Sequence, residues 1–110
     1  MPIKNYPAAV LSTHDGDTVT VRVELGLGIE LTQPLRLVGV NCPELPTPAG
    51  IAARSFTQQW LKDHPGPWTL TASGDGRDKY GRLLGRLTAA DGRTLNDDLL
   101  AAGQAVAMKG

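Results

Sequence analysis

The sequence predicts an α+β fold, mainly β, in which five strands close a small barrel and two or three helices pack against it. The chain of 110 residues fits one domain, residues 1–110. Its 13 glycines and 8 prolines indicate many turns and short elements. Apolar and polar residues alternate with the period of half-buried strands, both before and after a central helical pattern. These observations exclude a long-helix bundle.

The first half of the chain contains three predicted strands. From Thr18 to Leu25 apolar residues alternate with polar ones, which predicts a strand with one buried face. Gly26-Leu27-Gly28 predicts a turn or bulge. The alternation resumes at residues 29–31, and a third strand is predicted at residues 35–40. Prolines at positions 43, 46 and 48 then end the sheet pattern.

A helix is predicted after these prolines, with Thr47 as its cap and Pro48 in its first turn. Its end is predicted at His64, which two prolines and a glycine follow. Apolar residues at helical spacing predict the face that packs on the barrel: Ala49, Ala52, Ala53, Phe56 and Trp60. For Phe56 and Trp60 we therefore prefer a core position to a base-stacking role.

The second half contains two further strands and a short helix. The strands are predicted at residues 68–73 and 83–89, with a turn at Asp91-Gly92. In the last helix Asn96 is predicted as the cap, and Gly103 as the end. Three strands, a helix, two strands and a helix is the usual element order of a five-stranded OB-fold barrel.

Composition excludes several classes of protein. The formal net charge is zero, so a strongly basic nucleic-acid coat is excluded and any nucleic-acid contact must use clustered charges. Cys42 is the single cysteine, which excludes an internal disulfide and a cysteine-rich zinc site. No apolar run is long enough to span a membrane. The first residues lack an apolar export core, which predicts a cytoplasmic protein, with a processed secreted form as the alternative. We also expect a monomer.

Three short clusters hold the residues that can do chemistry: His14 to Thr18, Arg36 to Glu44, and Asp78 to Arg82. Each has an ordinary structural explanation. Asp-Gly pairs are common in turns, Arg36 could pair with a surface acid, and Lys79 and Arg82 could belong to a solvated loop.

Taken together, the clusters match the needs of phosphodiester hydrolysis. Arginines can offer forked donors to a phosphate that gains charge in the transition state. A hard cation on oxygen ligands can polarise the phosphate and hold water, and a carboxylate can deprotonate that water. Candidates for these roles are the two arginines, Arg36 and Arg82, and the two acids, Asp17 and Glu44.

The sequence resembles the staphylococcal nuclease family over nearly its whole length. Any one of the shared motifs is weak, but six occur in the family's order at compatible spacing. They are Asp15 to Thr18, Arg36-Leu37, Asn41 to Glu44, Gly50 to Ala53, Asp78 to Arg82, and Asn96 to Gly103.

The resemblance implies an OB barrel and a calcium-dependent endonuclease acting on DNA or RNA. It implies that Asp17, Asn41 and the backbone carbonyl of Cys42 bind Ca²⁺. It implies that Arg36 and Arg82 grip the scissile phosphate and that Glu44 acts on the attacking water. Lys79 and Tyr80 would meet a neighbouring phosphate and the sugar or base.

Two departures from the family pattern matter. Asn41 stands where the pattern has a second metal-binding Asp, so we expect weaker metal binding. The chain stops at Gly110, before the family's last helix, and the tyrosines that line the nucleotide pocket have no counterpart. Two alternatives to a nuclease follow: a barrel that binds nucleic acid or protein without turnover, and a purely structural assembly protein.

Overall fold

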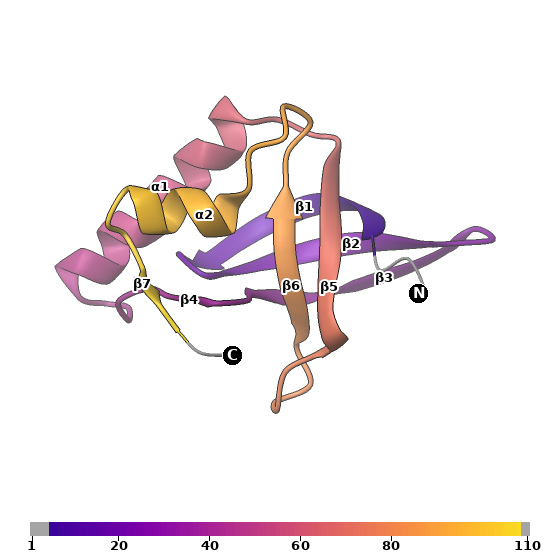
Figure 1. Cartoon of the computed structure of the whole chain (residues 1–110), viewed down its shortest axis with the longest axis horizontal. Helices are drawn as coiled ribbons and strands as arrows, with labels where there is room; N and C mark the ends of the chain where they lie inside the picture. Colours follow the sequence, from indigo (N-terminus) through magenta and orange to yellow (C-terminus); the bar gives the residue numbers. More distant parts are fainter. Residues whose placement is uncertain (1–4, 109–110) are drawn as a thin grey trace.

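The computed structural model describes residues 5–108, except for the side chain of Asp75. Five strands form a closed barrel in the order β1–β2–β3–β6–β5, and two short strands, β4 and β7, pair separately (Figure 1). The strands are β1 (Asn5–Asp15), β2 (Thr18–Gly26), β3 (Ile29–Leu37), β4 (Val40–Asn41), β5 (Trp68–Arg77), β6 (Leu83–Thr88) and β7 (Val106–Ala107). The helices are α1 (Pro48–Asp63) and α2 (Leu95–Ala101).

The predicted class, a five-stranded barrel with helices packed on it, is confirmed, but the first strand was not predicted. Within β1 the pairing with β2 shifts register twice, between Val10 and Ser12 and between Thr13 and Asp15. Each bulge breaks the period of two on which a sequence pattern depends. The predicted strands at 29–31 and 35–40 instead form β3, which continues from Ile29 to Leu37, and the separate β4.

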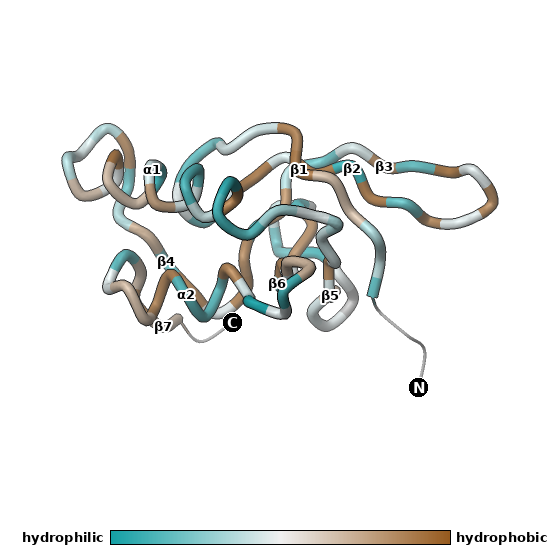
Figure 2. Tube along the Cα trace, turned by 90° about the horizontal axis from the view of Figure 1, so that it is seen from above, coloured by the Kyte–Doolittle hydropathy of each residue, from teal (hydrophilic) through white to brown (hydrophobic). Residues whose placement is uncertain are grey.

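The core lies inside the barrel and under α2. The predicted alternation of β2 is confirmed at Val19, Val21 and Val23, which are all buried. The prediction that Leu25 lies on the buried face is wrong. Leu25 is 47% exposed, because β2 and β3 run beyond the barrel as a hairpin. Figure 2 shows this hairpin projecting from the body, with apolar residues at its tip.

Helix α1 begins and ends where the sequence predicts. The Thr47 hydroxyl accepts a hydrogen bond from the Gly50 amide, and His64 is the C-terminal cap. Trp60 is buried and Phe56 is partly buried, as expected. The buried face of α1 is rotated by part of a turn from the predicted face, because Ala49 and Ala52 are exposed. The buried residues are Gly50, Ala53, Thr57 and Trp60. Gly50 packs on the backbone of Glu44, Ala53 and Thr57 face Gly16 in the β1–β2 turn, and Trp60 bonds to Asp98 on α2.

Helix α2 corrects a second prediction. Its N-terminal cap is Thr94, whereas Asn96 lies inside the helix and is 1% exposed. The Asn96 amide oxygen accepts a hydrogen bond from the Leu87 amide at 3.2 Å, and its nitrogen donates to the Val38 carbonyl at 2.9 Å. Asn96 therefore joins α2 to the barrel instead of capping the helix.

Candidate functional site

The β1–β2 turn rests directly on α1. A Cβ atom added at Gly16 would lie 2.8 Å from both the Ala53 Cβ and the Cys42 Sγ. The Thr57 hydroxyl donates a hydrogen bond of 2.7 Å to the Gly16 carbonyl. Only glycine permits such a close approach, so α1 determines where the next residue, Asp17, is placed.

Asp17 is 7% exposed, and both of its carboxylate oxygens have partners. Oδ2 accepts a hydrogen bond of 2.9 Å from the Cys42 amide and lies 3.5 Å from Arg36 Nη1. Oδ1 accepts a hydrogen bond of 3.2 Å from the Thr18 hydroxyl. The carboxylate thus joins the start of β2 to the segment that follows β4.

Arg36 on β3 is 8% exposed, and its guanidinium group reaches the same place. Nη1 donates to the Leu37 carbonyl at 2.9 Å, and Nη2 donates to the Asn41 side-chain oxygen at 3.3 Å. The structure therefore brings into contact four residues that the sequence analysis assigned to metal and phosphate binding: Asp17, Arg36, Asn41 and Cys42.

Asp15 is a residue of this site to which the sequence analysis assigned only a turn role. Burial raises the pKa of Asp15, and the hydrogen bond to Asp17 and the negative charge of Asp17 raise it further. Two neighbouring carboxyl groups favour a bound cation, because a cation relieves their repulsion. The signal in the sequence was the spacing of two aspartates across one glycine.

Cys42 is free and buried. Burial, followed by the negative charges of Asp17 and Asp15, raises the pKa of the Cys42 thiol to about 12. The thiol therefore stays protonated at neutral pH, which makes it a poor nucleophile.

The oxygen atoms gathered here suit a hard cation such as Ca²⁺. They comprise the Asp17 carboxylate and the Asn41 amide oxygen, with Asp15 beside them, and Ca²⁺ accepts both donor types. Within residues 5–108, no group of three or more His, Cys, Asp or Glu side chains forms a metal site. The donors therefore fit the chemistry of calcium, but they supply little negative charge.

Glu44 lies in the loop between β4 and α1, and its side chain is exposed. Its backbone carbonyl accepts hydrogen bonds from the amide and the hydroxyl of Thr47. A Cβ atom at Gly50 would lie 2.2 Å from this carbonyl, so the loop is held tightly against the first turn of α1. Among the described residues, none forms a hydrogen bond or ion pair with the Glu44 side chain, which is open to solvent.

The remaining predicted site residues lie in the β5–β6 loop. The Lys79 ammonium and the Arg82 guanidinium lie 5.2 and 5.5 Å from the centre of the Tyr80 ring, and Tyr80 is 72% exposed. Arg82 immediately precedes β6, where Leu84 pairs with Arg36 across the parallel β3–β6 contact. Both arginines therefore lie along the same pair of strands.

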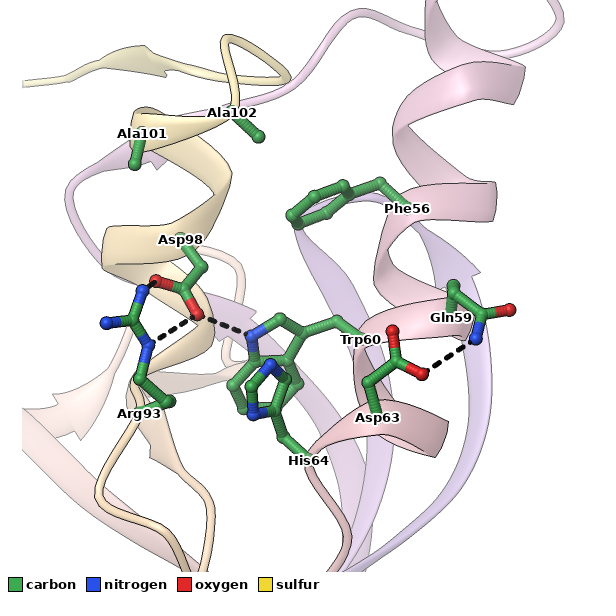
Figure 3. Close-up of a pocket in the computed structure, with 9 residues that line it drawn as sticks. All are labelled: Phe56, Gln59, Trp60, Asp63, His64, Arg93, Asp98, Ala101 and Ala102. Carbon is green, nitrogen blue, oxygen red and sulfur yellow. Dashed lines mark hydrogen bonds and ion pairs between the residues drawn. The ribbon is translucent and has the colours of Figure 1, made fainter.

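A cavity of about 380 Å³ lies elsewhere, between α1 and α2 (Figure 3). Its charged residues pair with the molecule's own groups. Asp98 accepts a hydrogen bond of 2.8 Å from the Trp60 indole and is paired with Arg93, and His64 lies 2.6 Å from Asp91. None of the predicted site residues lines this cavity. The paired side chains around it connect the two helices.

Comparison with known proteins supports the resemblance. The family described as staphylococcal nuclease homologue matches residues 34–110. Proteins named "Uncharacterized endonuclease" from Escherichia coli O157:H7 and from Escherichia coli are each 30% identical over 96 residues, which is 87% of this chain. The chain spans 57% of the length of these curated relatives. Within residues 5–108, no helix is both long and apolar enough to cross a membrane.

Proposed function

The chain belongs to the staphylococcal nuclease family, and on that premise we propose that it hydrolyses phosphodiester bonds of DNA or RNA with a bound Ca²⁺. The observation that supports this most directly is the contact of Arg36 with both Asp17 and Asn41. This contact brings a phosphate-binding group and oxygen donors for a cation to one place.

Asp17, Asn41 and the Cys42 carbonyl would hold the ion. When bound, the cation supplies charge that polarises the phosphate and favours deprotonation of water. Arg36 and Arg82 bind the scissile phosphate from the β3–β6 side and stabilise the charge that develops on it. Neither arginine can be replaced well by lysine, which offers a point charge instead of a fork of donors.

Glu44 accepts the proton of the attacking water. Its exposed carboxylate lies on a loop that Gly50 and Thr47 hold in place, so it is accessible to solvent while its backbone is constrained. Lys79 and Tyr80 lie beside Arg82 and contact the neighbouring phosphate and the sugar or base of the substrate.

A plasmid-nicking assay with calcium or with chelator tests this function. Arg22→Ala is a matched control for Arg36→Ala, because Arg22 forms an exposed ion pair with Glu30. We expect calcium-dependent nicking that is lost in Arg36→Ala and kept in Arg22→Ala. Nicking that persists in chelator, or in Arg36→Ala, would contradict the proposed site.

Asn41 favours a second candidate function, a barrel that binds nucleic acid without cutting it. Its neutral amide supplies no charge to the metal site, and Arg36 already bonds to it. Retention of a labelled oligonucleotide without any cleavage at saturating calcium would identify this function.

A further inference from the structure

The Asp78 carboxylate organises the whole turn that contains Arg82. Oδ1 accepts hydrogen bonds of 2.9 Å from the amides of Tyr80 and Arg82. Oδ2 accepts a hydrogen bond of 2.7 Å from Arg82 Nε. The Asp78 amide donates back to the Arg82 carbonyl at 2.9 Å. One carboxylate thus binds both the backbone and the side chain of Arg82.

This contact occupies one nitrogen of the Arg82 guanidinium group and leaves the other two. Nε is occupied by Asp78, whereas the two Nη groups form no hydrogen bond or ion pair within the described part of the chain. Arginine can grip a phosphate through Nε and one Nη group, or end-on through both Nη groups. With Nε held, only the end-on arrangement is available.

A second contact ties the turn to the strand that carries Arg36. Arg77 Nη1 donates a hydrogen bond of 2.7 Å to the Gly81 carbonyl and also bonds to the Gln33 side chain. Gln33 lies on β3, three residues before Arg36. The position of Arg82 is therefore fixed relative to the strand of the other arginine.

We propose that Asp78 is a positioning residue, which holds Arg82 through Nε so that both Nη groups bind the phosphate end-on. This rests on the proposed function for its catalytic consequence. Desolvation is the largest single influence and raises the pKa of Asp78, but the hydrogen bonds from Arg82 and Tyr80 and the charge of Arg82 together outweigh it and lower the pKa. Asp78 is thus ionised at neutral pH.

Asp78→Asn separates this role from a purely structural one. The Asn carbonyl oxygen can still accept from the two amides of the turn, but its NH₂ group cannot accept from Arg82 Nε. Asp91→Asn is the matched control, because Asp91 accepts the amide of Arg93 two residues on, in a turn remote from the site.

The first measurement uses NMR and does not depend on activity. In the parent and in Asp91→Asn we expect a downfield, slowly exchanging Nε–Hε signal from Arg82, and we expect Asp78→Asn to lose it. Titration with inorganic phosphate should shift the Arg82 side-chain signals, with weaker affinity in Asp78→Asn. An Nε–Hε signal or a phosphate affinity that Asp78→Asn leaves unchanged overturns the proposal.

The second measurement is kcat and KM on a short oligonucleotide. We expect Asp78→Asn to lower kcat on the order of tenfold to a hundredfold while the protein stays folded, with a small loss of melting temperature because the hydrogen bond to Arg82 Nε is lost. In an Arg82→Ala background the same change should add no further loss, because Asp78 acts through Arg82. Full activity in Asp78→Asn, or losses that add, would contradict the positioning role while leaving the nuclease function intact. A parent protein that cuts nothing would contradict the nuclease function, and the phosphate titration would then decide the role of Asp78.

Discussion

At the scale of single residues, Asn41 is the candidate metal ligand that we interpret as a departure from the family pattern. Its side-chain oxygen lies 3.3 Å from Arg36 Nη2, and Arg36 Nη1 lies 3.5 Å from Asp17. The arginine thus contacts two of the oxygen donors assigned to the cation. A bound cation and the Arg36 guanidinium group would be attracted to the same oxygen atoms. The neutral amide of Asn41 adds no negative charge that would favour the cation.

We predict that Asn41→Asp will tighten calcium binding by about tenfold or more. Two opposite charges at 4 Å attract by ~4 kcal/mol at an effective dielectric constant of 20, and ~1.4 kcal/mol corresponds to tenfold. Repulsion from Asp17 and a stronger pair with Arg36 offset part of this gain. Calorimetric titration measures the change, and Asn5→Asp at the exposed start of β1 is the control. Equal affinities in the parent and Asn41→Asp would place Asn41 away from the ion.

We also predict that Glu44→Gln will lower turnover by ~10²–10⁴-fold, the usual contribution of a general base. Its affinity for nucleic acid should stay close to that of the parent, because the exposed Glu44 side chain bonds to no described residue. Single-turnover cleavage and fluorescence anisotropy measure the two quantities. Glu24→Gln in the β2–β3 hairpin is the control, and near-normal cleavage by Glu44→Gln would remove Glu44 from the mechanism.

At the scale of elements, α1 and α2 hold the segments that carry the site. Thr57 on α1 bonds to the β1–β2 turn. Asn96 on α2 bonds to Val38 and Gly85, which follow β3 and lie within β6. The helices therefore serve as supports for the loops, and a change in either helix reaches Asp17 or Arg36 through the backbone.

We predict that Asn96→Ala will destabilise the protein by about 1–3 kcal/mol, because it leaves the buried Leu87 amide and Val38 carbonyl without partners. Urea unfolding measures this as a lower midpoint with an unchanged slope. Asp97→Ala, which removes an exposed pair with Arg86, should cost at most about 1 kcal/mol. Similar losses in both variants would show that Asn96 does not join α2 to the barrel.

At the scale of the whole molecule, a network of polar side chains joins α1, α2 and the turn after β6. Asp98 bonds to Trp60 on α1 and pairs with Arg93 in the turn (Figure 3). His64 at the end of α1 pairs with Asp91. This network lines the cavity between the helices.

We predict that this network makes the fold sensitive to acid. Burial raises the pKa of Asp98, but hydrogen bonds from Trp60 and Arg93 outweigh it and lower the pKa below its ordinary value. A lowered folded-state pKa gives stability that is present above the unfolded value of about 3.9 and is lost as the pH falls through the folded value. Asp98→Asn should therefore melt below the parent at pH 7, and the difference should shrink below about pH 4. A difference that stays constant from pH 7 to pH 2 would contradict this account.

The sequence by itself determined the fold class, the start of α1 and the identity of the candidate site residues. Each depends on short local patterns and on their order along the chain. Thr47 and Pro48 favour a helix start locally, and alternation through Val19, Val21 and Val23 indicates a buried strand face. Motif order supplied the family and, with it, the candidate residues that we propose for phosphate and metal binding.

Only the tertiary structure decided how these residues meet. The bulged strand β1 has no regular period, the role of Asn96 depends on groups 58 and 9 residues away, and Thr57 reaches the β1–β2 turn across 41 residues. Asp17 meets the Cys42 amide across 25 residues. Local patterns record the period and the caps of an element, whereas such contacts exist only once the barrel has closed and the helices have packed on it.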